Sequence, residues 1–324
     1  MTTRRFGAWQ HQALVAALVA WSLEATCRSP TDEAASPGLL GQVPPSSGAI
    51  PFAPAVLSAG IHPHGSLAFS PDSRTVVWSA FLGDGPGQTL YLSTFDGTTL
   101  APPMRMPFAA DSGSGGPAFS SDGTKLFFGS RRPYPGPGDA RMYGVWYVER
   151  TSTGWSDPVA VVATLDSLRA VGQVSIARSG NLYFEGRRPN EVPRLHRAEF
   201  ANGRYQVPVL LAGPINRADA VDPFVDPDER FLVFAALWRG DSRGSTDLYI
   251  SYKGADGTWG EPVQLGQQVN TAGLERFPAV SRDGRYLLFV RAHGDYPGDG
   301  THYYWIASAR SGVPSARAGP RGQE

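Results

Sequence analysis

The sequence has little cysteine, little lysine and no net charge. Its single cysteine, Cys27, cannot form a disulfide within the chain, so packing alone must stabilise the folded part. Lys125 and Lys253 are the only lysines, and arginine carries the rest of the positive charge. Basic and acidic side chains number 29 each, so no global field points to nucleic acid or to an anionic membrane surface.

Motifs for several kinds of chemistry are also missing. No glycine-rich phosphate loop opens a helix, the six histidines show no HExxH spacing, and no G-x-S-x-G occurs. We therefore expect no nucleotide, no metal and no other cofactor. Glycine and proline together make up about a fifth of the chain, with 38 and 28 residues, and this favours many tight turns over long helices.

The N-terminus has the features of an export signal. A short basic region precedes "ALVAALVAWSL", an apolar stretch of 11 residues that is too short to span a bilayer but suits a secretory signal. Cys27 follows almost at once and resembles the lipid-acceptor cysteine of bacterial lipoproteins, although Glu24 stands where that signal has an apolar residue. We predict a signal peptide over residues 1–27 and a periplasmic or outer-membrane-anchored lipoprotein with the lipid on Cys27. An ordinary cleaved signal and a secreted protein are the alternative.

The remaining chain divides into three parts. Residues 28–48 are rich in Pro, Ser, Gly and Ala and are predicted to form a flexible tether. Residues 49–311 contain the repeats described next and should form the folded domain. Residues 312–324 are predicted to be a disordered tail.

A short phrase recurs five times, each time joining two apolar strands through a polar turn. The copies are "AFSPDSRTVVWSA" (68–80), "AFSSDGTKLFFGS" (118–130), "SIARSGNLYFEG" (175–186), "FVDPDERFLVFAA" (224–236) and "AVSRDGRYLLFVR" (279–291). A third strand follows each copy and contains Tyr or Trp in four of the five, and most copies have a fourth strand. Four strands per 40–50 residues is the pattern of a β-propeller blade.

The fold class predicted is therefore all-β, a propeller of four-stranded antiparallel blades. The fifth copy lacks a fourth strand, while "AIPFAPAVL" (49–57) precedes the first copy unassigned. If this N-terminal segment supplies the missing strand, a ring of five blades is closed. A ring of six blades is the alternative.

The acids of the fourth copy lie within its turn. Asp226, Asp228 and Glu229 correspond to "SPDS", "SSDG", "ARSG" and "SRDG" in the other copies. Such residues suit a turn because their side chains bond to nearby amides and glycine tolerates positive φ. We interpret the three acids as turn formers and not as a metal or catalytic site.

The repeats resemble the WD-repeat-like propeller units of TolB-type proteins, whose blades carry a phrase close to "fSPDGxxLyF". The resemblance covers about 240 residues and is closest over 222–291, with "DLYISY", "WGEPVQLG" and "VNT". It departs in "ARSGN" and at Ser73, where the family has glycine. The resemblance implies an exported propeller that acts as an interaction module. It also leaves open a glycan-cleaving enzyme, because such enzymes share the architecture.

Binding residues are expected at the end of the ring with long loops, which we call the loop end; the opposite end, with the turns inside each repeat, is the turn end. Charged and aromatic side chains gather in the predicted loops and before the first strands. The ligand residues that we predict are His62, His64, Arg131, Arg169, Arg187, Asp222, Trp238, Arg239, Glu275, Arg276 and Arg291. These charges could grip a polar ligand, or they could pair with one another and seal the channel.

The predicted ligand is an envelope protein or a glycan, with no nucleic acid and with membrane contact only through a lipid anchor. Trp238 and Tyr134 could stack on a sugar or insert into a partner, whereas Trp78, Trp146, Trp155, Trp259 and Trp305 fall on repeat positions and should be core. The enzymatic alternative needs two carboxyls facing each other across the channel. Its candidates are Asp111, Asp219, Asp222 and Glu275.

Overall fold

The computed structural model describes residues 38–82, 87–109, 113–133, 144–161, 168, 170–188, 190–294, 296–298 and 300–315. The chain divides into two compact units, Met1–Ser36 and Pro37–Glu324, and every described residue belongs to the second. The predicted signal peptide with Cys27, and the predicted site residues Asp111, Tyr134 and Arg169, lie outside the described residues.

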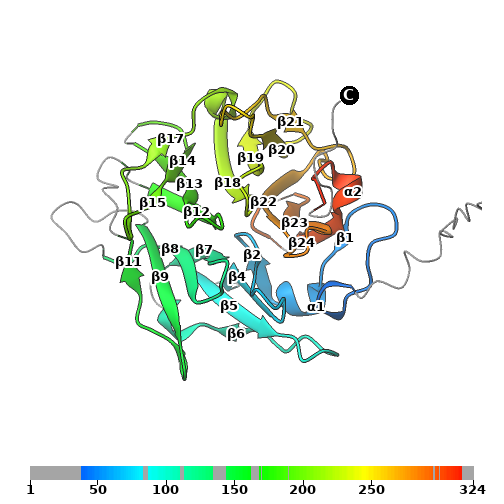
Figure 1. Cartoon of the computed structure of the whole chain (residues 1–324). Coiled ribbons are helices and arrows are strands. Elements are labelled where there is room, and N and C mark those ends of the chain that lie inside the picture. Colours follow the sequence, from blue (N-terminus) through cyan, green and yellow to red (C-terminus); the bar gives the residue numbers. More distant parts are fainter. Residues whose placement is uncertain are drawn as a thin grey trace, which may run out of the picture. The chain divides into compact units, whose positions relative to one another are not determined.

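The described strands form five antiparallel blades, as predicted (Figure 1). Blade 1 contains β2 (Ile61–Pro63), β3 (Ala68–Phe69), β4 (Thr75–Leu82), β5 (Gln88–Thr94) and β6 (Met104–Arg105). Blade 2 contains β7 (Ser114–Phe119), β8 (Lys125–Ser130), β9 (Gly144–Thr151), β10 (Gly154–Trp155) and β11 (Val159–Ala160). Blade 3 contains β12 (Ala170–Ile176), β13 (Leu182–Arg187), β14 (Arg194–Ala198) and β17 (Val209–Leu210), with the hairpin of β15 (Phe200–Ala201) and β16 (Arg204–Tyr205).

Blade 4 contains β18 (Asp219–Val225), β19 (Phe231–Leu237), β20 (Thr246–Tyr252) and β21 (Val263–Gln264), and blade 5 contains β22 (Leu274–Val280), β23 (Tyr286–Ala292), β24 (Thr301–Ala307) and β1 (Ile50–Pro51). The helices are short: η2 (Leu39–Gly41), α1 (Pro54–Leu57), η3 (Pro107–Ala109), η4 (Pro214–Arg217) and α2 (Ser308–Ser311). One parallel pair, Thr246 with Leu274, continues the hydrogen bonding from blade 4 into blade 5. In the described part of the chain, no helix has the length and apolar character needed to cross a membrane.

The N-terminal strand closes the ring, which confirms the five-bladed prediction. In β1, Ile50 and Pro51 pair with Trp305 and Tyr304 of β24, and the Phe52 amide donates to the Tyr303 carbonyl at 2.8 Å. The Phe52 ring, fully buried, packs 5.0 Å from the Trp305 ring. The first and last blades are thereby joined by residues from both ends of the domain.

Each pair of neighbouring blades shares a hydrophobic core, because successive residues of a strand face opposite sides. In β19, Leu232 and Phe234 pack between blades 3 and 4, whereas Phe231 and Val233 pack between blades 4 and 5. Both faces of each blade are thus covered, and this explains why the repeated strands are apolar at nearly every position. The five repeat tryptophans follow the prediction: Trp78, Trp146, Trp259 and Trp305 are buried, and Trp155 packs, partly buried, against the core that contains Trp146.

The repeated turns hold themselves together with side-chain bonds. In blade 1 the Ser70 hydroxyl donates to Asp72 at 2.5 Å, and Asp72 accepts the Arg74 amide at 3.0 Å. Blades 2 and 5 repeat both bonds, with Asp122 and Asp283 as the acceptors. In blade 4 Asp226 accepts the amides of Asp228 and Arg230, so these acids form the turn, as predicted.

Ser73 occupies a position that favours glycine. Its φ is +56°, and Gly123, Gly180 and Gly284 hold the equivalent left-handed position in other blades. A Ser73→Gly variant should therefore raise the free energy of unfolding by about 0.5–1 kcal/mol, because the left-handed strain exceeds the entropy that glycine adds to the unfolded chain. Urea unfolding measures this. Gly123→Ser is the reciprocal control and should be destabilising, since a Cβ there would meet Pro71 at 2.7 Å.

Both ends of the folded unit extend past the predicted boundaries. Leu39 and Leu40, within the segment predicted as a tether, are buried in the core between blades 1 and 5. Val313, within the predicted tail, is buried between blades 4 and 5. These isolated apolar side chains pack against the hydrophobic cores between the blades. The composition of the two segments, which is rich in small and polar residues, does not predict this packing.

Candidate functional site

The predicted ligand residues at the loop end fall into an exposed group and a buried group. Arg131 and Arg187 are exposed, and Trp238 is 76 % exposed with a left-handed φ of +56°. Arg239 lies over the Tyr249 ring at 4.8 Å, with its Nε 3.4 Å from Asp241. His62 and Asp219 are partly buried at the starts of β2 and β18.

Asp222 and Arg276 form a buried ion pair across blades 4 and 5. Arg276 donates from Nε and Nη2 to the two carboxylate oxygens of Asp222 at 2.6 and 3.0 Å. The Asp222 side chain is 1 % exposed, and its φ of +53° falls at the β-bulge between Val221 and Phe224. This bulge turns Asp222 toward Arg276, and the two-pronged geometry is the strong form of such a pair.

Glu275 and Arg291 form a second buried pair within blade 5. Arg291 Nε donates to Glu275 at 2.9 Å, and its Nη2 donates to the Val269 carbonyl at 2.6 Å. Glu275 also accepts the amide and the hydroxyl of Thr271 at 3.0 and 2.6 Å. Two of the four candidate catalytic carboxylates are therefore engaged with arginine, as expected if the charges seal the channel at this level.

Glu185 in β13 joins the first pair, and the sequence analysis missed it. Its carboxylate accepts the Asp222 amide at 3.0 Å. Burial, followed by the negative charge of Asp222, raises the pKa of Glu185 from 4.5 to about 7. The sequence contains a signal that could have identified Glu185. It is the one charged residue at a repeat position that Ser79, Gly129, Ala235 and Val290 occupy in the other blades.

His64 completes this cluster from blade 1. Burial, and then the charge of Arg276, lowers the pKa of His64 to about 3, so the ring is neutral at pH 7. The Tyr296 hydroxyl is hydrogen-bonded to Nδ1 at 2.5 Å, and the Phe277 ring lies 5.0 Å away. We call His64, Glu185, Asp222, Arg276 and Tyr296 the axial cluster.

The axial cluster predicts a specific pH dependence. Between about pH 4.5 and 7 the folded chain holds a proton on Glu185 more tightly than the unfolded chain, so this group lowers stability as the pH rises through that window. A Glu185→Gln variant can still accept the Asp222 amide but cannot ionise. We expect it to lose less stability than wild type between pH 5 and pH 8, and to be more stable by about 1–3 kcal/mol at pH 8.

Urea unfolding of both proteins at the two pH values measures the effect. His64 contributes the opposite slope, since its lowered pKa makes stability rise with pH from about 3 to 6.5. Both proteins keep His64, so its contribution cancels in the comparison. Parallel pH profiles for wild type and variant would contradict the assignment.

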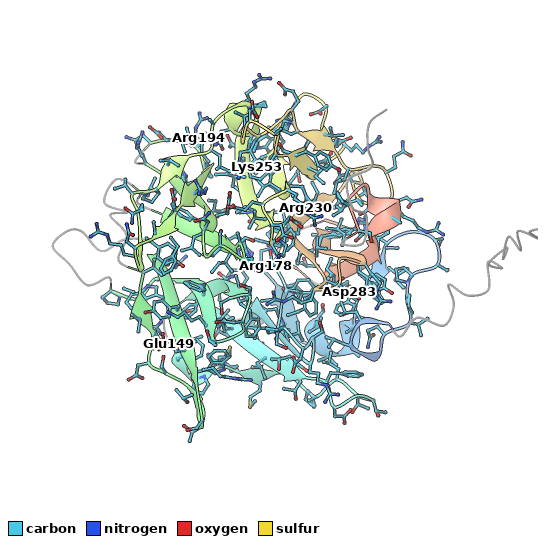
Figure 2. All side chains as sticks on the ribbon, in the orientation of Figure 1. Glu149, Arg178, Arg194, Arg230, Lys253 and Asp283 are labelled. Carbon is cyan, nitrogen blue, oxygen red and sulfur yellow. The ribbon has the colours of Figure 1, made fainter. Side chains whose placement is uncertain are left out.

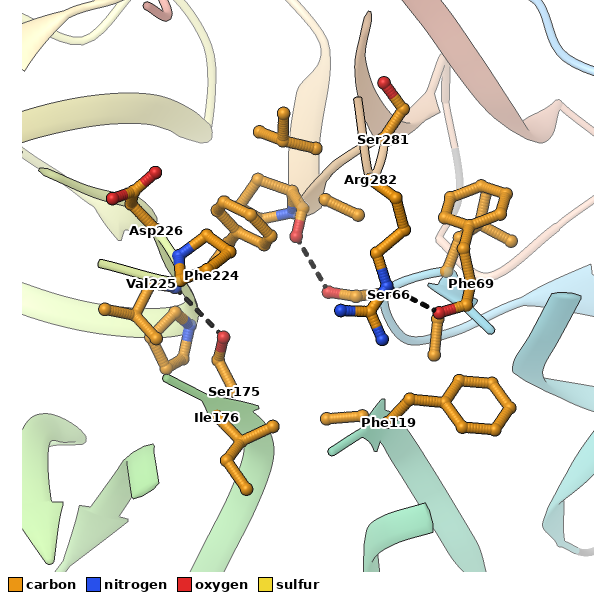
Figure 3. A pocket seen from close by; sticks show the side chains of 18 of the residues that line it. Ser66, Phe69, Phe119, Ser175, Ile176, Phe224, Val225, Asp226, Ser281 and Arg282 are labelled. Carbon is orange, nitrogen blue, oxygen red and sulfur yellow. Dashed lines mark hydrogen bonds between the residues drawn. The ribbon is translucent and has the colours of Figure 1, made fainter. Parts of the chain in front are cut away.

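Among the described residues, a pocket lies on the axis at the turn end, opposite the end at which the loops predict ligand residues. This pocket of about 260 Å³ is lined by the inner strands of all five blades and by the turns of blades 3, 4 and 5. Figure 3 shows Phe69, Phe119, Ile176, Phe224 and Val225 around it, each from a different strand except the last two. Aromatic and aliphatic side chains therefore form about half of its wall, and polar groups form the other half.

Ser66 and Gln173 form the inner end of this pocket. The Gln173 side chain of blade 3 accepts the Ser66 amide of blade 1 at 3.3 Å, and the Ser66 hydroxyl donates to the Pro278 carbonyl of blade 5 at 3.0 Å. Asp222 and Glu185 do not line the pocket. The channel thus has a charged level around the axial cluster, in which Asp222 is fully buried and the other members are partly buried, and an open level lined by both apolar and polar groups.

Charged residues of the turns line the outer end of the pocket. Arg178, which lies near the centre of the ring in Figure 2, is paired with Asp228, and Arg230 is paired with Asp226 at 2.8 Å. Arg282 reaches from blade 5 to two carbonyls of other blades, Phe69 at 3.0 Å and Ser120 at 3.3 Å. Sequence analysis did not single out Arg282; its turn position holds Arg178 in blade 3 and Pro71, Ser121 and Pro227 in the other blades. Among the described residues, no three His, Cys, Asp or Glu side chains gather as a metal site.

The architecture defines the class: the chain is a β-propeller. No family model matches the sequence, and no curated protein matches it. Solved structures do match in fold. TolB from Acinetobacter baumannii has a TM-score of 0.49 and 15% identity, over 77% of this chain and 55% of that one. A protein assigned as TolB from Agrobacterium tumefaciens has a TM-score of 0.50 and 14% identity, over 75% and 89% of the two chains.

An exo-β-1,3-galactanase from Clostridium thermocellum matches equally well, with a TM-score of 0.51 and 15% identity over 81% of this chain and 63% of that one. This chain therefore shares its fold with TolB proteins and with a glycoside hydrolase, and spans little more than half of the first TolB. Identities this low show the fold alone.

Proposed function

We propose that this chain is an exported, non-catalytic binding module of the cell envelope whose protein or glycan ligand enters the axial pocket at the turn end. The observation that carries the proposal is the separation of the two levels of the channel. The open level is lined by apolar side chains and, over a similar area, by polar groups, and its two aspartates, Asp226 and Asp228, are each paired to an arginine. Such a lining suits recognition of a ligand that combines an apolar surface with polar groups.

The experiment is affinity capture from an envelope extract of the source organism. Ala118 and Phe224 occupy the same repeat position and both line the pocket, so an Ala118→Phe variant should fill it with a second ring. Val263 on the outer strand β21 is 58 % exposed, and Val263→Phe adds a similar ring far from the axis as a control. We expect a protein or an intact glycan to be retained by wild type and by Val263→Phe and lost with Ala118→Phe. Capture of the same components by all three would overturn the proposal.

The glycan-cleaving alternative has one observation in its favour. A carboxyl with a raised pKa, Glu185, lies next to a second carboxylate, Asp222, as in an acid and base pair. Both Asp222 oxygens are engaged by Arg276, however, and neither acid lines the open pocket. New reducing ends from an envelope glycan, formed by wild type and abolished in Glu185→Gln, would favour the enzyme instead.

A further inference from the structure

The positive charge of Arg282 lacks an acidic partner in the described structure. Arg178 and Arg282 hold the same position in the turns of blades 3 and 5, and Arg178 is paired with Asp228. Asp283, the acid next to Arg282 in sequence, pairs instead with Arg285 at 2.5 Å. Arg282 thus differs from the other arginine at its repeat position.

The pocket carries one excess positive charge. Its lining contains three arginines, Arg178, Arg230 and Arg282, but only two acids, Asp226 and Asp228, which the first two arginines already neutralise. Arg282 is partly buried, and burial lowers its pKa without a neighbouring acid to oppose the effect. A cation in such surroundings is less well solvated than in water, so a bound anion would be favoured.

The guanidinium also has hydrogen-bond capacity left. Of its five N–H groups, Nε donates to Phe69 and Nη2 donates once to Ser120. These two carbonyls fix the side chain across the turn end, as Figure 3 shows for Arg282 beside Phe69. Among the described residues, Nη1 makes no bond and Nη2 makes only one, so the guanidinium can still donate to the oxygens of a carboxylate.

Apolar surface surrounds this position. Phe69, Phe119 and Phe224 from three blades line the same pocket. A ligand that places a carboxylate on Arg282 can therefore bury an aromatic or aliphatic body against these rings. At about 260 Å³ the pocket has room for one such group and not for a folded domain.

Resting on the proposed binding function, we propose that the axial pocket takes a carboxylate attached to an apolar body, with Arg282 as its anion-binding residue. Two sources share this chemistry, a small aromatic acid and the C-terminus of a peptide that ends in an apolar residue. The probes are 3-phenylpropanoate and the peptide acetyl-Ala-Ala-Phe, each as the free acid and as the amide. Binding to the full chain is measured by calorimetry and by ligand-observed NMR up to about 10 mM, the weak end of useful affinity.

We expect at least one acid to bind more tightly than its amide, and Arg282→Gln to weaken that acid about tenfold or more. Arg282→Lys keeps the charge and should keep part of the preference for acid over amide. Arg217→Gln is the control, since it removes the same charge from a surface ion pair outside the pocket, and it should change affinity less than about threefold. Which of the two acids binds better identifies the source.

Two outcomes would overturn the inference. If acid and amide bind equally well, and Ala118→Phe abolishes the binding of both, the pocket is a binding site but Arg282 is not its anion-binding residue. No binding of any probe to wild type would remove the inference as well, while the capture experiment would still decide the proposed function. Thermal unfolding of each variant shows whether a loss of binding reflects a loss of folding.

Discussion

Arg276→Met is expected to lower the free energy of unfolding by about 3–5 kcal/mol at pH 8. The substitution leaves Asp222 buried with no cation, and Glu185, held beside it, can then ionise only at a still higher pH. The loss should be smaller at pH 5, because a carboxyl without its counter-ion takes up a proton more readily. Urea unfolding at both pH values measures the difference.

A double variant separates the charge from the packing. Arg276→Met with Asp222→Asn removes both members of the pair, so it should recover a large part of the stability that Arg276→Met loses. Arg217→Met is the surface control: its pair with Glu261 is more than 60% exposed on both sides and should matter by less than about 0.5 kcal/mol. A loss below about 1 kcal/mol for Arg276→Met would contradict the assignment of Asp222, 1% exposed, as a buried carboxylate that depends on this counter-ion.

Asn270→Ala is expected to cost about 2–4 kcal/mol. The Asn270 side chain accepts the Leu248 amide at 2.9 Å and donates to the carbonyls of Leu248 and Leu265 at 2.9 and 2.8 Å. The Asn270 amide group thus hydrogen-bonds to the backbone of β20 and to the residue after β21, as a backbone peptide group of a neighbouring strand would. Alanine leaves the buried Leu248 amide without a partner, and an unsatisfied buried donor costs about 1–3 kcal/mol beyond the bonds lost.

The same arrangement recurs in blade 3 and gives an internal repeat of the test. Asn216 accepts the Leu195 amide at 2.8 Å and donates to Leu195 and Leu211 at 3.0 and 2.8 Å, so Asn216→Ala should cost a similar amount. Gln268→Ala, two residues before Asn270 and exposed, should be nearly neutral. Unfolding in urea gives the costs, and hydrogen exchange should show a large loss of protection at the Leu248 amide. Unchanged protection there would contradict the role assigned to Asn270.

The role of these asparagines could not be predicted from the sequence. The motif "VNT" resembles TolB-type repeats, but the sequence does not show what its asparagine, Asn270, contacts. The partner of Asn270 is 22 residues away, in a strand of the same blade. Only the path of the connecting chain brings the side chain back to that strand.

The site prediction was limited for the same reason. Loop length suggested that ligands bind at the loop end, and the residues chosen there include Asp222, Glu275, Arg276 and Arg291. In the structure these four residues form two ion pairs, Asp222 with Arg276 and Glu275 with Arg291. The pocket found among the described residues lies at the turn end, beside turns to which the sequence analysis assigned only a structural role. Whether the exposed residues Arg131, Arg187 and Trp238 bind a ligand stays a prediction.

The sequence by itself determined the repeat and the turn role of Asp226, and it predicted five blades closed by the N-terminal strand, with six blades as the alternative. The repeat and the turn are local properties, because the alternation of side chains and the bonding of a short turn depend on a few consecutive residues. Only the tertiary structure decided that Arg276 meets Asp222, 54 residues earlier, that Glu185 lies beside both, and that Arg282 reaches two other blades. These contacts cross between blades, and they depend on how five sheets pack around one axis, a geometry that no single repeat contains.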